Sequence, residues 1–181
     1  MCSSDLAEGV VLRPGQEAEV CLALDGWVAD RACELDRGLL LLIDYGHPAA
    51  ELYDGARRPR GTLLAYRRHR AVDEPFAAVG RQDLTAHVDV TAVTRAAAAA
   101  GLETLGVGTQ MEALQGLGAG ELFATLGGDP ATAPQDYLVA RAALLRMLDP
   151  GAMGRFRVMA FGRGLAAGTE LRAFSFRLPG R

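Results

Sequence analysis

An uninterrupted run of five apolar residues, Leu39–Ile43, constrains the fold of this chain more than any other feature, and it ends abruptly in Asp44-Tyr45-Gly46. A run this short and without alternation predicts a strand that is covered on both faces. In open α/β sheets, ligands bind beyond the carboxyl ends of such strands. Asp44 could therefore hold a ligand hydroxyl or ammonium group. The alternative is that Asp44-Tyr45-Gly46 is only a turn that leads the chain out of the sheet.

Helical and extended patterns alternate along the rest of the sequence. The ranges with helical spacing of apolar residues are Glu17–Leu35, Asp89–Gly101, Met111–Leu126 and Ala133–Leu148. The other expected strands are Thr62–Tyr66, Leu102–Thr109, Arg155–Phe161 and Leu171–Leu178. The last two alternate and predict an antiparallel hairpin across Gly162–Gly168. This order of elements predicts an α/β fold that ends in an antiparallel hairpin.

Composition narrows the class of protein. The 181 residues are 50% apolar and 23% charged, as expected for one globular domain. The net charge of −3 gives no support to nucleic-acid binding, and no apolar run is long enough to cross a membrane. The N-terminus lacks the pattern of a signal peptide, so we expect a cytoplasmic protein. All 19 basic residues are Arg, which excludes Schiff-base lysine catalysis and a phosphate loop ending in Gly-Lys-Ser/Thr.

One candidate site is the segment around His87, where Asp83 and Asp89 flank an imidazole. A histidine beside a carboxylate can act as a general base or orient a substrate. Asp89 has a structural alternative, because it also stands where a carboxylate would cap the helix that follows. A metal-dependent hydrolase using all three residues is a further alternative. No other His or Cys is spaced to complete a ligand set, so no metal site is expected.

A second candidate is the basic stretch Arg57–Arg70, which contains six arginines and His69 but no acidic residue. Such a stretch could bind an anionic ligand, an acidic protein or RNA. The alternative is a solvated face whose charge is neutralised by neighbouring acidic residues, namely Asp54, Asp73 and Glu74.

Several segments resemble one known family in order and spacing. These segments are GLLLLIDYGHP (38–48), GTLLAYRRHR (61–70), GRQDLTAHVDVTAV (80–93), GLETLGVGTQMEAL (101–114) and MGRFRVMAFGRG (153–164), preceded by PGQEAEV (14–20). They are similar to the C-terminal half of the MidA family, S-adenosylmethionine-dependent methyltransferases related to a mitochondrial complex I assembly factor. The IDYG and DLTAHVD motifs carry most of this resemblance.

The resemblance implies the C-terminal part of a class I, Rossmann-like methyltransferase with a seven-stranded, mostly parallel sheet. Leu39–Asp44 would be its fifth strand, and Leu102–Thr109 and Arg155–Phe161 its last two. It also implies methyl transfer from S-adenosylmethionine to a protein substrate, with arginine as the acceptor. By analogy, the partner would be a subunit of a respiratory complex.

The family's cofactor-binding half lies N-terminal to every matching segment. Its glycine-rich loop and its ribose-binding acidic residue have no counterpart here, and Gly116–Gly120 lies in the wrong part of the chain. We therefore expect residues 1–9 to be a disordered leader or sequence scar and residues 10–181 to be the C-terminal part of a methyltransferase domain. The S-adenosylmethionine site would lie mostly in the missing half, so the chain alone would be inactive. The uncovered edge at Leu39–Ile43 would favour a homodimer.

The resemblance also implies a set of residues that face the substrate cleft. Tentative catalytic residues are His87 and Asp83, and tentative substrate-binding residues are Asp44, Tyr45, His69 and Gln110, with no cofactor-binding residue in this chain. The competing function is a non-catalytic assembly or binding module that uses the Arg57–Arg70 surface.

Overall fold

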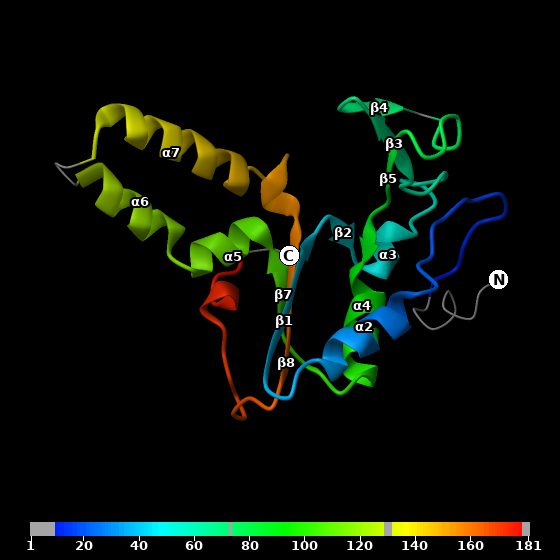
Figure 1. The fold of residues 1–181 in the computed structure, drawn as a ribbon, viewed down its shortest axis with the longest axis horizontal. Helices are drawn as coiled ribbons and strands as arrows, with labels where there is room; N and C mark the ends of the chain where they lie inside the picture. Colours follow the sequence, from blue (N-terminus) through cyan, green and yellow to red (C-terminus); the bar gives the residue numbers. More distant parts are fainter. Residues whose placement is uncertain (1–9, 73, 129–131, 179–181) are drawn as a thin grey trace. The chain divides into compact units, whose positions relative to one another are not determined.

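The computed structural model describes residues 10–72, 74–128 and 132–178, so the predicted leader over residues 1–9 lies outside the described residues. The chain divides into two compact units (Figure 1). Unit 1 comprises Met1–Asp30 and Gly46–Ala100, and unit 2 comprises Arg31–Tyr45 and Gly101–Arg181. Helices and strands occur in both units, which confirms the α/β class.

Unit 1 is built from short elements. They are β2 (Gly46–His47), α3 (Ala49–Leu52), β3 (Leu64–Arg67), β4 (Arg70–Val72), β5 (Asp83–Thr85), β6 (Val88–Asp89) and α4 (Val90–Ala99). β3 pairs antiparallel with β4 and β5, whereas β2 and β6 form a separate parallel pair. The helix predicted after Asp89 is confirmed, because α4 buries its apolar face, including Val93 and Ala97.

The helix predicted over Glu17–Leu35 is wrong in its first third. The observed helix, α2, runs over Leu24–Cys33. The chain before it is extended instead, because the backbone N–H of Glu17 donates to the carbonyl of Pro59 (3.0 Å) and Glu17 forms an isolated bridge with Arg60. Tertiary hydrogen bonds therefore override the helical spacing of this segment.

Unit 2 contains the larger sheet and a group of helices. Its elements are β1 (Gly38–Asp44), β7 (Glu103–Thr109), α5 (Gln110–Gly116), α6 (Ala119–Gly128), α7 (Pro134–Leu148), the 3-10 turns η1 (Met153–Arg155) and η2 (Arg172–Phe174), and β8 (Arg157–Arg163). The strand order is β1-β8-β7, and β8 runs antiparallel to both neighbours. β1 and β7 are therefore parallel to each other.

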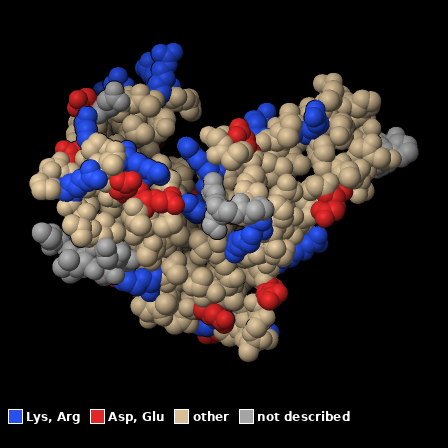
Figure 2. Space-filling model, turned by 180° about the vertical axis from the view of Figure 1, so that it is seen from behind, with Lys and Arg blue, Asp and Glu red and all other residues tan. Residues whose placement is uncertain are grey.

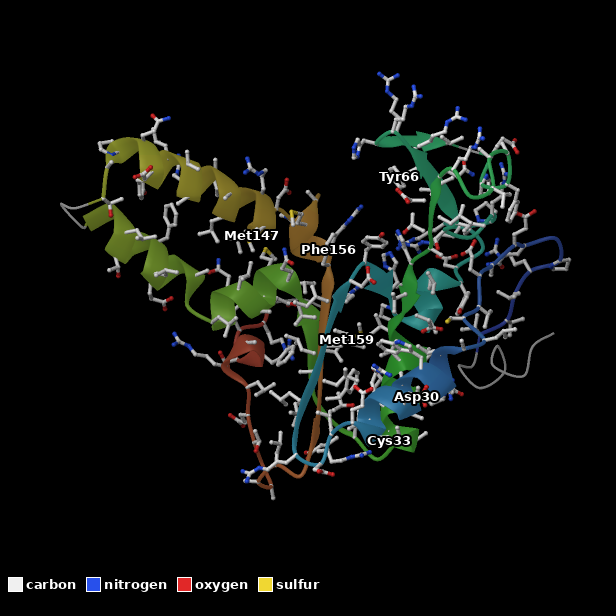
Figure 3. All side chains as sticks on the ribbon, viewed as in Figure 1. Asp30, Cys33, Tyr66, Met147, Phe156 and Met159 are labelled. Atoms are coloured by element: carbon white, nitrogen blue, oxygen red, sulfur yellow. The ribbon has the colours of Figure 1, made fainter. Side chains whose placement is uncertain are left out.

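The centre of this sheet is its most buried part. On β8, Val158 to Phe161 are each no more than 5% exposed, and Figure 3 labels Met159 within this strand. The alternation of this segment puts Met159 on the same face as Arg155 and Arg157, yet Met159 is only 1% exposed. β8 has a strand on each side and is covered on both faces, so consecutive side chains are buried.

β1 confirms the predicted strand but corrects its environment. Leu39, Leu41 and Ile43 are 46%, 56% and 52% exposed, so the strand is not covered on both faces. β1 is an edge strand of the sheet among the described residues, and successive side chains of a strand point to opposite faces. An apolar run therefore does not prove burial on both sides.

The predicted hairpin between Arg155–Phe161 and Leu171–Leu178 is wrong. β8 pairs with β1 and β7, and the later segment forms the η2 turn. Arg172 donates from Nε to the carbonyl of Gly116 (3.0 Å), and the Phe174 ring packs over Gly106, where a Cβ atom would lie 2.3 Å away. This segment covers β7 and α5 instead of extending the sheet.

The helical range predicted over Met111–Leu126 forms two helices, α5 and α6. Gly118, with φ of +92°, separates α5 from α6, and α6 and α7 lie side by side (Figure 1). α5 begins at a capping box. The Thr109 hydroxyl accepts from the backbone N–H of Glu112, and the Glu112 carboxylate accepts from the backbone N–H of Thr109. The carboxylate of Glu112 accepts from Thr109 N (2.8 Å), Thr109 Oγ1 (2.8 Å) and Leu178 N (3.3 Å).

This capping box gives a pH-dependent stability. Burial raises the pKa of Glu112, but the hydrogen bonds from Thr109 and Leu178 and the charge of Arg177 together hold it below its ordinary 4.5. A carboxyl with a lowered folded pKa stabilises the fold above its unfolded pKa, and this contribution is lost as pH falls through the folded value. Glu112→Gln should therefore destabilise unit 2 by about 1–2 kcal/mol at pH 7 and by less below pH 4.5. Urea unfolding across pH 3–8, followed by circular dichroism, measures the difference, and a pH-independent difference would contradict the assignment.

Candidate functional site

The Gly46-His47 segment, at the end of the IDYG motif, lies beside the DLTAHVD motif in unit 1. The short parallel ladder of β2 and β6 pairs Gly46 with Val88 and His47 with Asp89. This approach requires glycine at position 46, because a Cβ atom there would lie 2.5 Å from the carbonyl oxygen of Val88. The ladder thereby places His47 next to the segment that carries His87.

Two imidazole rings form the centre of the candidate site. The ring centroids of His47 and His87 are 5.2 Å apart, with an interplanar angle of 30°. His47 Nε2 lies 2.9 Å from an Nη2 atom of Arg58, and its Nδ1 lies 3.3 Å from the Glu51 carboxylate. Guanidinium nitrogens only donate, so Nε2 of His47 is the acceptor and its proton sits on Nδ1, facing Glu51. This pair of contacts fixes the ring of His47 beside His87.

A chain of hydrogen bonds holds the backbone of His87. The His87 N–H donates to Thr62 Oγ1 (2.9 Å), and the Thr62 hydroxyl donates to the Glu19 carboxylate (3.1 Å). Glu19 also accepts from the backbone N–H groups of Thr62 (2.9 Å) and Leu63 (3.0 Å). Four segments that are distant in sequence therefore converge at His87: PGQEAEV, IDYGHP, GTLLAY and DLTAHVD.

Asp89 takes its predicted structural role. Its Oδ1 accepts from the backbone N–H of Ala92 (3.0 Å), which caps α4. In the described part of the chain, no group of three or more His, Cys, Asp or Glu side chains could hold a metal ion. The alternative of a metal-dependent hydrolase built on Asp83, His87 and Asp89 therefore has no structural support.

Two other predicted residues of unit 1 lie outside this cluster. Asp83 is an exposed residue of β5, opposite Tyr66 of β3 in the register. His69 is exposed in the two-residue turn between β3 and β4, with φ of +63°. Their catalytic and substrate-binding roles stay predictions.

The remaining three predicted residues belong to unit 2. Asp44 ends β1, and its Oδ1 accepts from the backbone N–H of Tyr45 (2.8 Å). The ring of Tyr45 packs edge-on against Phe156, which Figure 3 labels, with centroids 5.5 Å apart. Gln110 begins α5, is nearly buried, and donates from its amide to the carbonyl of Met147 (3.0 Å). Their substrate-binding roles also stay predictions.

The glycine-rich segment Gly116–Gly120 does not fit a cofactor cradle. A Cβ atom at Gly116 would lie 2.4 Å from the carbonyl oxygen of Arg172, and one at Gly118 would lie 2.8 Å from the Arg172 guanidinium. These glycines pack against protein atoms rather than opening toward a ligand. Within the described ranges, this segment therefore offers no place for the adenosyl or methionyl part of S-adenosylmethionine.

The sequence analysis missed most residues that hold His87. Glu19, Thr62, His47 and Arg58 were not singled out, although the first three lie inside the motifs that carry the family resemblance. The parallel pairing of β2 and β6 involves only two residues per strand, too few to leave a periodic pattern. The usable signal was the clustering of polar residues within the motif segments themselves.

Comparison with protein families matches residues 3–108 to a family described as "putative S-adenosyl-L-methionine-dependent methyltransferase". The match covers more than half of the chain and includes every residue of the His47–His87 cluster. The chain therefore belongs to this methyltransferase family. A search of curated proteins finds no match.

Two solved structures from Burkholderia thailandensis are similar to this chain. One is the native crystal structure of an uncharacterized superfamily protein, with 36% identity and a TM-score of 0.78 over 87% of this chain and 41% of that chain. The other is a member of the same superfamily, described as a "likely methyl transferase" and bound to S-adenosyl-homocysteine. It also shows 36% identity and a TM-score of 0.78, over 87% of this chain and 40% of that one. The present chain thus spans about two fifths of the length of these relatives.

Among the residues that the structure describes, no helix combines the length and apolarity needed to cross a bilayer.

Proposed function

We propose that this chain is part of an S-adenosylmethionine-dependent protein methyltransferase of the MidA type, with arginine as the acceptor. The observation that carries the proposal is the convergence of four motif segments on His87, in a chain that belongs to a methyltransferase family. The strand order β1-β8-β7 supports placing β1 fifth and β7 and β8 last in a seven-stranded sheet. The acceptor protein would be a cytoplasmic partner, by analogy a respiratory complex subunit.

S-adenosylmethionine would supply the methyl group, with most of its binding residues in a part of the protein that this chain lacks. The chain's own contribution would lie on the acceptor side. A guanidinium that gains a methyl group on nitrogen must lose one proton, and His87 would accept it. His47, held by Arg58 and Glu51, would keep the His87 ring in place. Neither step requires a metal ion.

The test is methyl transfer by the protein expressed from its complete coding sequence, with tritiated S-adenosylmethionine and arginine-containing peptides. His87→Gln should lower kcat by about 10²- to 10⁴-fold with little change in the KM of the peptide. In the unaltered protein the rate should fall at acidic pH, because a protonated imidazole cannot accept a proton. This fall should be absent from the residual rate of His87→Gln. A matched control is Arg146→Gln on α7, an exposed residue far along the chain, which should retain the full rate.

Two results would overturn the proposal at different levels. A complete protein that transfers no methyl group to any protein or peptide would remove the function. Full activity in His87→Gln, with an unchanged circular dichroism spectrum, would remove the role of His87 and leave the function standing. Calorimetric titration of S-adenosylmethionine into the 181-residue chain alone should give no heat, because most of its binding residues would lie outside this chain.

A further inference from the structure

The basic stretch Arg57–Arg70 separates into two groups with different surroundings. Arg57 forms an ion pair with Asp54 (3.5 Å), and Arg58 is engaged by His47 and by the carbonyl of Glu51. Both arginines therefore act within the fold. The second group, in contrast, lies at the end of the β3–β4 hairpin.

Four arginines line one solvent-facing pocket, and three of them belong to this hairpin. They are Arg67, Arg68, Arg70 and Arg81, and the pocket is completed by three small apolar residues, Ala71, Val72 and Ala78. All four arginines are exposed, and none forms an ion pair with an acidic residue that the structure describes. Asp73, one of the acidic residues expected to neutralise them, lies outside the described residues. Figure 2 shows basic side chains gathered over this end of the molecule, and Figure 3 places Tyr66 on the strand that leads to it.

The strand pairing and the turn of the β3–β4 hairpin both place residues where their charge or backbone geometry is locally unfavourable. Arg67 and Arg70 are direct partners in the antiparallel register, where like charges oppose each other. The turn residues Arg68 and His69 have φ values of +51° and +63°, a left-handed geometry that favours Asn-Gly. An anionic partner would relieve the repulsion between the like charges at this exposed tip.

We propose that this arginine pocket binds an acidic segment of a partner protein, independently of methyl transfer. Guanidinium groups pair with carboxylates through two parallel hydrogen bonds, and four such groups match several acidic side chains. Phe76 and Val79, which are 70% and 80% exposed on the segment that carries Ala78, supply apolar contacts beside the charges. Arginine together with exposed apolar side chains is the composition of protein–protein interfaces.

A protein segment fits this surface better than a nucleic acid does. None of the residues that line the pocket is aromatic, so a base bound among the four arginines would have no ring to stack on. The chain as a whole carries a net charge of −3. A long polyanion would therefore be repelled beyond the pocket, whereas a short acidic segment feels mainly the local positive potential within a Debye length.

The test measures binding of a fluorescein-labelled, glutamate-rich peptide to the 181-residue chain by anisotropy. The peptide should bind, with an affinity that falls as salt rises from about 50 to about 300 mM. The same peptide with glutamines should not bind. The variant Arg67→Gln, Arg70→Gln, Arg81→Gln should weaken binding by at least about tenfold. Arg68 is left unchanged, so that the turn keeps its sequence.

The matched control removes the same charge elsewhere. Arg141→Gln, Arg146→Gln and Arg155→Gln, all exposed residues of unit 2, should together leave the affinity within about twofold. Equal loss in both triple variants would show a non-specific charge effect and overturn the proposal, as would undiminished binding in the pocket variant. Absence of peptide binding to the unaltered chain would also overturn it. Tighter binding of a single-stranded RNA of similar charge would overturn the choice of a protein partner.

Discussion

Gly46→Ala should lower the free energy of unfolding of unit 1 by about 1–3 kcal/mol, because the new methyl group has no room. Its Cβ atom would lie 2.5 Å from the carbonyl oxygen of Val88, and a backbone atom on a paired strand cannot rotate away as a flexible side chain can. The β2–β6 ladder would have to open. His47 and His87 would then lose the spacing of 5.2 Å between their ring centroids.

The measurement uses Trp27, the only tryptophan of the chain and a residue of unit 1, as the fluorescence probe in urea unfolding. Gly26→Ala is a matched control, since Gly26 is exposed in α2 with no atom within 4 Å of the added carbon. Alanine in a helix interior is favoured over glycine, so this control should stabilise the chain by about 0.5–1 kcal/mol. In the complete protein, Gly46→Ala should also reduce methyl transfer. A Gly46→Ala chain as stable as the unaltered one would refute the close contact.

We expect the chain to self-associate through β1, and Leu41→Lys should then leave it a monomer. β1 presents an outer edge without a described partner, and Leu39, Leu41 and Ile43 are about half exposed along it. Such an edge pairs readily with a second copy. Leu41 is the central residue of the strand Gly38–Asp44, so in a symmetric antiparallel pair it would lie opposite itself. A lysine there would remove apolar burial and place two like charges together, which should raise the dimer Kd by at least about tenfold.

Sedimentation velocity over a range of protein concentrations measures this change. Leu145→Lys on α7 is the matched control, because Leu145 is 54% exposed, close to the 56% of Leu41, but lies on a helix. The control should associate as the unaltered chain does. Dissociation in Leu145→Lys but not in Leu41→Lys would place the self-association on the helices and contradict pairing through β1.

Strong local signals predicted much of the fold. The α4 helix was expected from Asp89 as a cap and from the alanine-rich sequence before Gly101, and both features are observed. Strand β1 was likewise expected from its apolar run, and β7 from its partial alternation of apolar and polar residues. Their partners were not, because strand pairing depends on contacts between distant segments. The alternation in Leu171–Leu178 suggested a strand, yet Phe174 instead fills the space above Gly106.

The candidate site shows the same limit. His87 could be selected from the sequence because a histidine between carboxylates stands out within one short motif. Glu19 and Arg58 could not, since Glu19 reaches the cluster through hydrogen bonds to the distant Thr62 and Leu63, and Arg58 through a hydrogen bond to His47. The basic stretch Arg57–Arg70 could be recognised from the sequence, but the different roles of its arginines could not. Its separation into arginines that act within the fold and arginines that line a pocket depends on the turn at Arg68 and His69.

The position of β8 in the sheet has a consequence for synthesis. β1 and β7 pair only through β8, whose residues Arg157–Arg163 come near the end of the chain. On a ribosome, the five apolar residues of β1 emerge long before their hydrogen-bonding partner has been made. Pairings between distant segments form slowly, and a strand that is exposed before its partner strand has formed is prone to aggregation. Unit 2 can therefore complete its sheet only once translation has passed Arg163, and the growing chain should rely on chaperones until then.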